Sequence, residues 1–153
     1  MNKFYKTVLL TGLFVGTTDL IYAFITLFIQ SGKFSEKMFN YIAGGALGLE
    51  TSLKGGNGVA FLGLFFHYFI AFAFTLLFFW IFPRLNFFSF NKYLVGMLYA
   101  VFVNVVVEQV ILRLTPLPSG SFSLADAYVN WVIFGIVFGI PIAYNAYKYY
   151  GVE

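Results

Sequence analysis

Asp19, His67 and Glu108 are ionisable residues that lie well inside long apolar stretches of a 153-residue chain, and the amides Asn104 and Asn130 lie in similar surroundings. An ionisable side chain within a membrane-spanning helix costs free energy. It therefore usually faces the interior of the bundle, finds a partner and marks a functional site. Carboxylates and an imidazole placed together can exchange protons, because each group shifts the protonation of the others. These five residues form the predicted polar cluster.

The sequence leaves three interpretations of this cluster open. The side chains could handle protons or ions, or they could only hydrogen-bond one another and fix the register of the helices. Alternatively, Asp19, His67 and Glu108 could offer one nitrogen and two carboxylates to a divalent metal. The sequence names no metal, and we predict no bound cofactor. Glu50 could cap a cavity beside the cluster, or it could be a solvated interfacial residue.

The composition excludes several classes of protein. Only 10% of the residues are charged and 61% are hydrophobic, whereas a soluble domain has about 25% charged residues. A cytosolic enzyme, a nucleic-acid binder and a disordered tail are therefore excluded. The chain has no cysteine and a single histidine, which excludes a disulfide scaffold, a Cys-type metal site and a bis-His haem. No catalytic triad or phosphate-binding motif predicts an enzyme.

The elements that position the cluster are predicted to be membrane-spanning helices. A spanning helix needs roughly 20 apolar residues, and four segments qualify: 8–29, 58–82, 93–112 and 124–147. A fifth apolar stretch, 38–51, would cover only about 21 Å as a helix. The prediction is an all-α integral membrane protein with a single domain, 1–153. It contains four transmembrane helices and a short interfacial or re-entrant helix between the first and second.

The predicted spans place the polar residues at a similar depth. Asp19 lies near the middle of its span and Asn104 at the midplane of the third. His67, Glu108 and Asn130 are displaced from the middle of their spans by a few residues. Because successive spans run in opposite directions, these displacements all point into one leaflet, away from the termini. We therefore expect the cluster to form in a shared interior.

Small residues recur at four-residue spacing and predict close contact between helices. Such small-xxx-small faces let helix backbones approach one another in a membrane. The same faces offer ways to self-associate, so we expect a homo-oligomer or a complex with partner membrane subunits. The predicted packing residues are Gly12, Gly16, Gly63, Gly135 and Gly139.

The ends of the spans predict an orientation and an interface. Five basic residues fall on the side of the termini and four on the other side, so the positive-inside rule slightly favours cytoplasmic termini. Tyr144, Tyr147, Tyr149 and Tyr150 surround Lys148 and predict an aromatic belt at the lipid headgroups. The lipid bilayer is the predicted partner, with no role for nucleic acid.

A series of short motifs carries a resemblance to known proteins. The motifs are, in chain order, Gly12-x3-Gly16-x2-Asp19, Tyr41-Ile42-Ala43-Gly44-Gly45 with Gly48, Gly55-Gly56, Gly63-Leu64-x2-His67-Tyr68 and Gly139-Ile140-Pro141. The chain resembles a group of bacterial four-span inner-membrane proteins with no assigned activity, distantly YagU-like. The resemblance implies a multi-pass protein of the bacterial cytoplasmic membrane. It transfers no catalytic residue.

Together these features lead to three functional hypotheses. The first is proton- or ion-linked transport by an oligomer or a complex subunit, which the ionisable residues favour. The second is a non-catalytic scaffold or accessory subunit of a membrane complex. The third is a membrane metal-binding protein.

Overall fold

The computed structural model describes residues 2–32, 35, 37–85, 89–118 and 124–151, and the regular elements in these ranges are all helices. Within them, four helices are long and apolar enough to cross a membrane. They are α1 (Lys3–Ser31), α4 (Asn57–Ile81), α5 (Lys92–Val105) with its continuations η2 (Val106–Ile111) and η3 (Leu112–Leu114), and α6 (Leu124–Phe134), which runs through η4 (Gly135–Gly139) into α7 (Ile140–Tyr150). The prediction of an all-helical chain with four such helices is confirmed.

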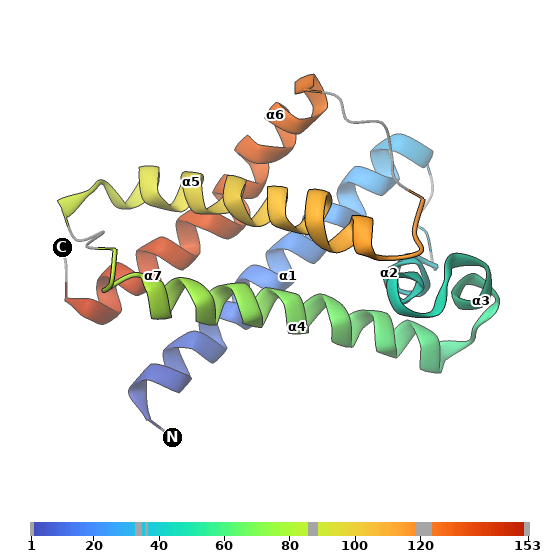
Figure 1. Cartoon of the computed structure of the whole chain (residues 1–153), viewed down its shortest axis with the longest axis horizontal. Coiled ribbons are helices and arrows are strands. Elements are labelled where there is room, and N and C mark those ends of the chain that lie inside the picture. The colour runs from blue at the N-terminus through green and yellow to red at the C-terminus, as the bar shows by residue number, and fades with distance from the viewer. Residues whose placement is uncertain (1, 33–34, 36, 86–88, 119–123, 152–153) are drawn as a thin grey trace.

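The four long helices alternate in direction and cross obliquely (Figure 1). The beginning of α1, the end of α4, the beginning of α5 and the end of α7 lie on the left side of the view, so the first and last helices of the described chain have their outer ends on that side. The short helices α2 (Met38–Leu47) and α3 (Leu49–Lys54) lie on the opposite side, beside the beginning of α4.

The region 38–51 differs from the expected single helix. It forms two helices because Gly48 has a φ of +82°, a left-handed conformation that glycine adopts without a Cβ penalty. The buried amide of Asn40 closes the resulting turn by donating to the carbonyl of Ser52 at 2.9 Å. Because α2 and α3 are joined by this bend, α2 can pack along α4 while α3 turns away.

The long helices approach closely at glycines. A Cβ on Gly63 would collide with the backbone carbonyl of Phe39 in α2, and a Cβ on Gly139 would collide with the carbonyl of Gly96 in α5. A Cβ on Gly12 would meet the ring of Phe72. These positions bring backbone against backbone, or backbone against ring, as small-residue faces do in membrane helices.

Proline explains a contact between α1 and α7. Pro141 has no N–H to give to the carbonyl four residues earlier, which belongs to Val137. That carbonyl instead accepts a hydrogen bond from the Thr18 hydroxyl of α1 at 2.8 Å. The same stretch forms the π-helical segment η4, so the irregular backbone is stabilised by a side chain from another helix.

An aromatic core holds the ends of α4, α5 and α7 together. Phe78 lies 4.6 Å from Tyr99 and Phe82 lies 4.9 Å from Tyr147, measured between ring centroids. Tyr147 is only 5% exposed and its hydroxyl donates to the carbonyl of Phe90 at 2.7 Å. The predicted aromatic belt is therefore wrong for Tyr147, which packs inward and bonds to a carbonyl just before the start of α5. Tyr144 is 47% exposed, as a belt residue would be.

Candidate functional site

The carboxylate of Glu108 is at the centre of a hydrogen-bonded group. Its Oε1 accepts from the amide of Asn104, one turn earlier, at 3.1 Å and from the amide of Asn130 in α6 at 3.4 Å. Asn104 is buried, while Glu108 and Asn130 are half-buried. The carboxylate thus joins the last part of the third long helix to the beginning of the fourth.

Two aromatic side chains extend this group. The Tyr22 hydroxyl of α1 donates to Oδ1 of Asn130 at 2.9 Å, and the indole N–H of Trp131 donates to Oδ1 of Asn104 at 2.7 Å. Tyr22, Asn104, Glu108, Asn130 and Trp131 are here called the Glu108 network. Both amides donate to the carboxylate through Nδ2 and accept from an aromatic donor through Oδ1, so each amide is fixed in one orientation.

The backbone at Glu108 is irregular. Glu108 lies in the π-helical segment η2, which follows directly after α5. A π-helical turn adds a residue to the ordinary helical repeat and is often found at functional sites. The N–H groups in such a turn pair with carbonyls five residues earlier, which rotates the following side chains relative to the α-helix before them.

A second polar group lies between α1 and α4. Nε2 of His67 is 2.8 Å from the carbonyl oxygen of Gly16. A carbonyl can only accept, so Nε2 carries the hydrogen, and Nδ1 is the atom at which a further proton would bind. The carboxylate of half-buried Asp19, three residues after Gly16, interacts electrostatically with His67. Asp19 and His67 are here called the Asp19–His67 pair.

The absence of a side chain at Gly16 makes this second group possible. A Cβ there would lie 2.9 Å from the ring of Tyr68 and 3.2 Å from the Cβ of Ala71, so glycine lets α4 approach the backbone of α1. Beside it, the hydroxyls of Thr17 and Tyr68 are hydrogen-bonded at 2.8 Å. The four-residue spacing of Gly12 and Gly16 thus serves the packing that the sequence predicts.

The structure divides the predicted cluster into two groups. Hydrogen bonds unite Asn104, Glu108 and Asn130, and none of the hydrogen bonds of the described residues joins Asp19 or His67 to them. Among the described residues, the only ion pair within 4.0 Å is Lys54 with Glu50. Asp19 and His67 are therefore not in direct salt-bridge contact. Helix α1 supplies Tyr22 to one group and Asp19, one turn away, to the other. The two groups therefore lie at a similar depth, and depth alone does not distinguish one group from the other.

The two other predicted roles are not supported by this geometry. Within the described ranges, no group of three histidine, aspartate or glutamate side chains is arranged to hold a metal ion. Glu50 lies on α3 with its side chain 84% exposed, paired with Lys54 at 2.6 Å. Glu50 is thus solvent-exposed, in agreement with the second of its two interpretations as far as solvation is concerned.

Sequence reasoning missed the aromatic donors of the Glu108 network. Tyr22 lies one turn after Asp19 on the same face of α1, and Trp131 directly follows Asn130. A buried Tyr or Trp usually finds a hydrogen-bond partner, so both neighbours could have been recognised as candidates. The packing of Tyr68 against Thr17 depends on the crossing of α1 and α4, which no local pattern encodes.

Comparisons with known proteins add nothing to this description of the site. No protein-family model, curated protein or solved structure matches the chain.

Proposed function

We propose that this chain is a multi-pass protein of the bacterial cytoplasmic membrane that takes part in proton- or ion-linked transport, as a homo-oligomer or as a subunit of a membrane complex. The observation that carries the proposal is the carboxylate of Glu108, hydrogen-bonded to two amides among apolar helices. A titratable group at this kind of location is typical of ion and proton pathways.

The chemistry of the network suits exchange of a proton at Glu108. Its Oε1 accepts hydrogen bonds from two amides, which hold the carboxyl group in one position between η2 and α6. The Tyr22 hydroxyl is the network's second group that can release and accept a proton, and Asn130 holds it close to the carboxylate.

The Asp19–His67 pair would supply a second exchange point. Because Nε2 of His67 is bonded to the backbone, binding of a proton at Nδ1 would create a cation beside the Asp19 carboxylate. Tyr22 and Asp19 lie one turn apart on α1, so this helix would connect the two exchange points.

The proposed membrane arrangement follows from the lengths and charges of the helices. The 25 residues of α4 extend about 37 Å at 1.5 Å per residue, more than the roughly 30 Å of hydrocarbon. Cytoplasmic termini would place α2 and α3 at the external surface. There the exposed Lys37, Glu50 and Lys54 would face water, and α2 would serve as the short interfacial helix.

Reconstitution into liposomes tests the transport proposal. Lumenal pH would be followed with a trapped dye after a potential is imposed, for the unaltered chain, Glu108→Gln and Asp19→Asn. Glu50→Gln is the matched control, because it also neutralises one carboxylate but at an exposed position. We expect flux from the unaltered chain and the control, and flux at the level of empty liposomes from Glu108→Gln.

A transport role is contradicted if all four proteins, tested with proton, sodium and potassium gradients, give only the flux of empty liposomes. It is also contradicted if Glu108→Gln and Asp19→Asn both retain the flux of the unaltered chain. Folding of each variant is checked by circular dichroism in the same detergent, so that loss of flux is not confused with loss of structure.

A second candidate function, a non-catalytic scaffold or accessory subunit, is favoured by a different observation. Among the described residues, no fully buried side-chain nitrogen or oxygen lacks a hydrogen-bond partner. A completely satisfied polar network fixes helix register without any exchange of protons. This alternative predicts that Glu108→Gln lowers thermal stability or the retention of co-purifying partners and leaves every flux unchanged.

A further inference from the structure

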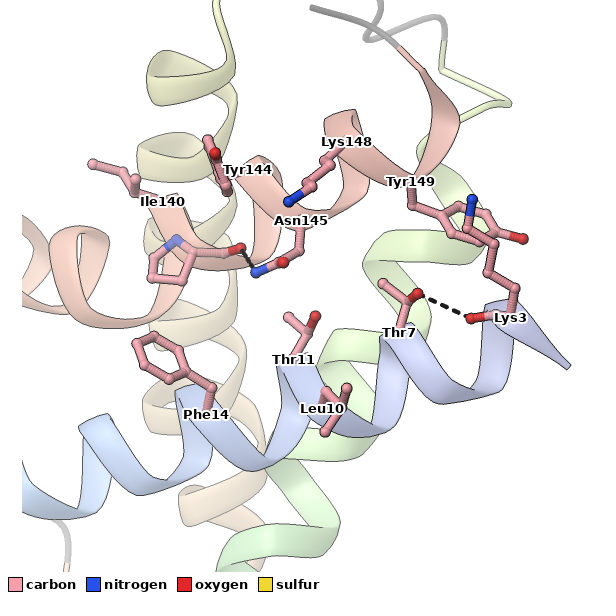
Figure 2. A pocket seen from close by; sticks show the side chains of 11 residues that line it. Lys3, Thr7, Leu10, Thr11, Phe14, Ile140, Tyr144, Asn145, Lys148 and Tyr149 are labelled. Atoms are coloured by element: carbon pink, nitrogen blue, oxygen red, sulfur yellow. Dashed lines mark hydrogen bonds between the residues drawn. The ribbon is translucent and has the colours of Figure 1, made fainter. Parts of the chain in front are cut away.

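A groove between α1 and α7 is separate from both polar groups. It has a volume of about 760 Å³, within the range of about 300–1,000 Å³ typical of small-molecule sites. Helix α1 forms one side and helix α7 the other (Figure 2). The groove begins at the end of the molecule that carries both termini and runs toward the middle of the helices.

The end of the groove formed by the start of α1 and the end of α7 is cationic. Lys3 and Lys148 both line it, and its lining contains no acidic residue among those that the structure describes. The ammonium group of Lys3 lies 5.9 Å from the centre of the Tyr149 ring, which also lines the groove. Lys92 lies 5.2 Å from the ring of Tyr144, another lining residue. The groove therefore presents positive charge that no lining carboxylate neutralises.

Thr11 provides an independent indication of a ligand. It is 3% exposed and points from α1 across the groove toward Asn145 (Figure 2). The hydrogen bonds formed among the described residues do not engage its hydroxyl, whereas the hydroxyl of Thr7 donates to the carbonyl of Lys3. A hydroxyl that a mostly buried residue aims into a groove favours a ligand with a hydrogen-bonding group at that depth.

The other end of the groove, toward the middle of α1 and the start of α7, is apolar and exposed. Leu10 and Phe14 line it from α1 and are 56% and 55% exposed, and Ile140 lines it from α7. From Lys3 to Phe14 the helix rises about 16 Å, close to half of the roughly 30 Å of bilayer hydrocarbon. The positive charge at one end of the groove would suit the headgroup of a phospholipid. The apolar surface along the length of one leaflet would suit its acyl chain.

We propose that this groove binds an anionic phospholipid, with the headgroup phosphate between Lys3 and Lys148, an ester carbonyl at Thr11 and an acyl chain along Leu10 and Phe14. The proposal rests on insertion of the four helices into a bilayer, which is part of the proposed function, and it does not depend on proton exchange. Basic pockets between membrane helices are known sites for anionic lipids.

Native mass spectrometry of the detergent-solubilised full chain tests the proposal. The protein would be titrated with phosphatidylglycerol and, separately, with phosphatidylcholine of the same acyl chains. We expect tighter binding of phosphatidylglycerol to the unaltered chain. Because a basic residue near a membrane surface contributes about fivefold to binding of anionic lipid, Lys3→Gln with Lys148→Gln should weaken phosphatidylglycerol binding roughly thirtyfold.

The control variant is Lys6→Gln with Lys54→Gln, which removes the same charge from exposed lysines outside the groove lining. It should bind phosphatidylglycerol as the unaltered chain does. Thr11→Val, which keeps the shape of the side chain, should weaken both lipids equally because both carry ester carbonyls.

Two results would overturn the proposal. One is equal binding of the two lipids to the unaltered chain. The other is equal loss of phosphatidylglycerol binding in the groove variant and the control variant, which would mean that net charge alone attracts the lipid. Inorganic phosphate is added as a competitor, and displacement of the lipid at millimolar phosphate would show a soluble-anion site instead. None of these results depends on a flux, so failure here leaves the transport proposal standing.

Discussion

At the scale of single residues, the polar side chains are defined by their partners more than by their depth. Asn104 and Asn130 each donate to Glu108 and accept from an aromatic side chain. These bonds distinguish a fixed network from a set of polar residues that happen to lie in apolar helices. The role of Trp131 follows from them, because it is the donor that orients Asn104.

Trp131→Phe should destabilise the bundle. The substitution keeps an aromatic ring and removes the indole N–H that lies 2.7 Å from Oδ1 of Asn104. Hydrogen bonds between membrane helices contribute about 0.6 kcal/mol on average and up to about 1.7 kcal/mol, so the free energy of unfolding should fall by about that amount. Unfolding in mixed micelles, followed by circular dichroism, measures it.

Trp80→Phe is the matched control, since Trp80 is 54% exposed on α4 and packs against Arg84. Its free energy of unfolding should lie within about 0.5 kcal/mol of that of the unaltered chain, as is usual for surface substitutions. Equal stability of the Trp131 and Trp80 variants would contradict the role given to Trp131.

At the scale of elements, close contacts at glycine and irregular helical turns position the side chains. The sequence predicts the glycine faces because small residues at four-residue spacing have a direct physical meaning. It does not predict which helix each face meets. The π-helical segments η2 and η4 are likewise not predicted from the sequence, and in η4 the carbonyl of Val137 bonds to Thr18 of another helix, a contact that no local pattern encodes.

Gly63→Ala should separate α2 from α4. The added Cβ would collide with the carbonyl of Phe39, and overpacking of this kind costs about 1–3 kcal/mol. Gly58→Ala in the same helix is the control, because a Cβ there meets nothing within 4 Å. Its stability should be equal or higher, since alanine favours helix. Thermal unfolding measures the stability of both variants. If Gly63→Ala is as stable as Gly58→Ala, the close contact between Gly63 and the carbonyl of Phe39 is contradicted.

Thr18 and Pro141 should show coupled effects on stability. Thr18→Val removes the hydroxyl that donates to the carbonyl of Val137 and should cost about 0.5–1.5 kcal/mol. Pro141→Ala supplies an N–H for the same carbonyl, so the cost of Thr18→Val should be smaller in that background. A double-mutant cycle measures the coupling, and simple additivity would show that the two residues do not share this carbonyl.

At the scale of the whole molecule, hydropathy and length are sufficient to predict four long helices, because a bilayer demands roughly 20 apolar residues per crossing. They are not sufficient to predict the site. Asp19, His67 and Glu108 were expected to share one interior, but the oblique crossing of α1 with its neighbours distributes them between two groups. Crossing angles come from the packing of all the helices, which no single segment encodes.

The alternating directions of the four helices predict a topology that can be measured. The chain has no cysteine, so single substitutions Lys6→Cys, Leu85→Cys and Gly56→Cys can be labelled with a membrane-impermeant maleimide in bacterial cells. With cytoplasmic termini, Gly56→Cys should react in intact cells, and the other two variants only after the membrane is permeabilised. Reaction of all three from the same side would contradict four crossings.

The central claim is that Glu108 exchanges a proton within the bundle, and infrared difference spectroscopy of the chain in liposomes tests it most directly. As pH is varied, we predict that one component of the carboxyl C=O absorption changes in intensity in the unaltered chain, in Glu50→Gln and in Asp19→Asn, and is missing from Glu108→Gln, where the components of the other carboxyl groups remain. If the spectra of the unaltered chain and Glu108→Gln change identically with pH, Glu108 keeps one protonation state and the claim is wrong.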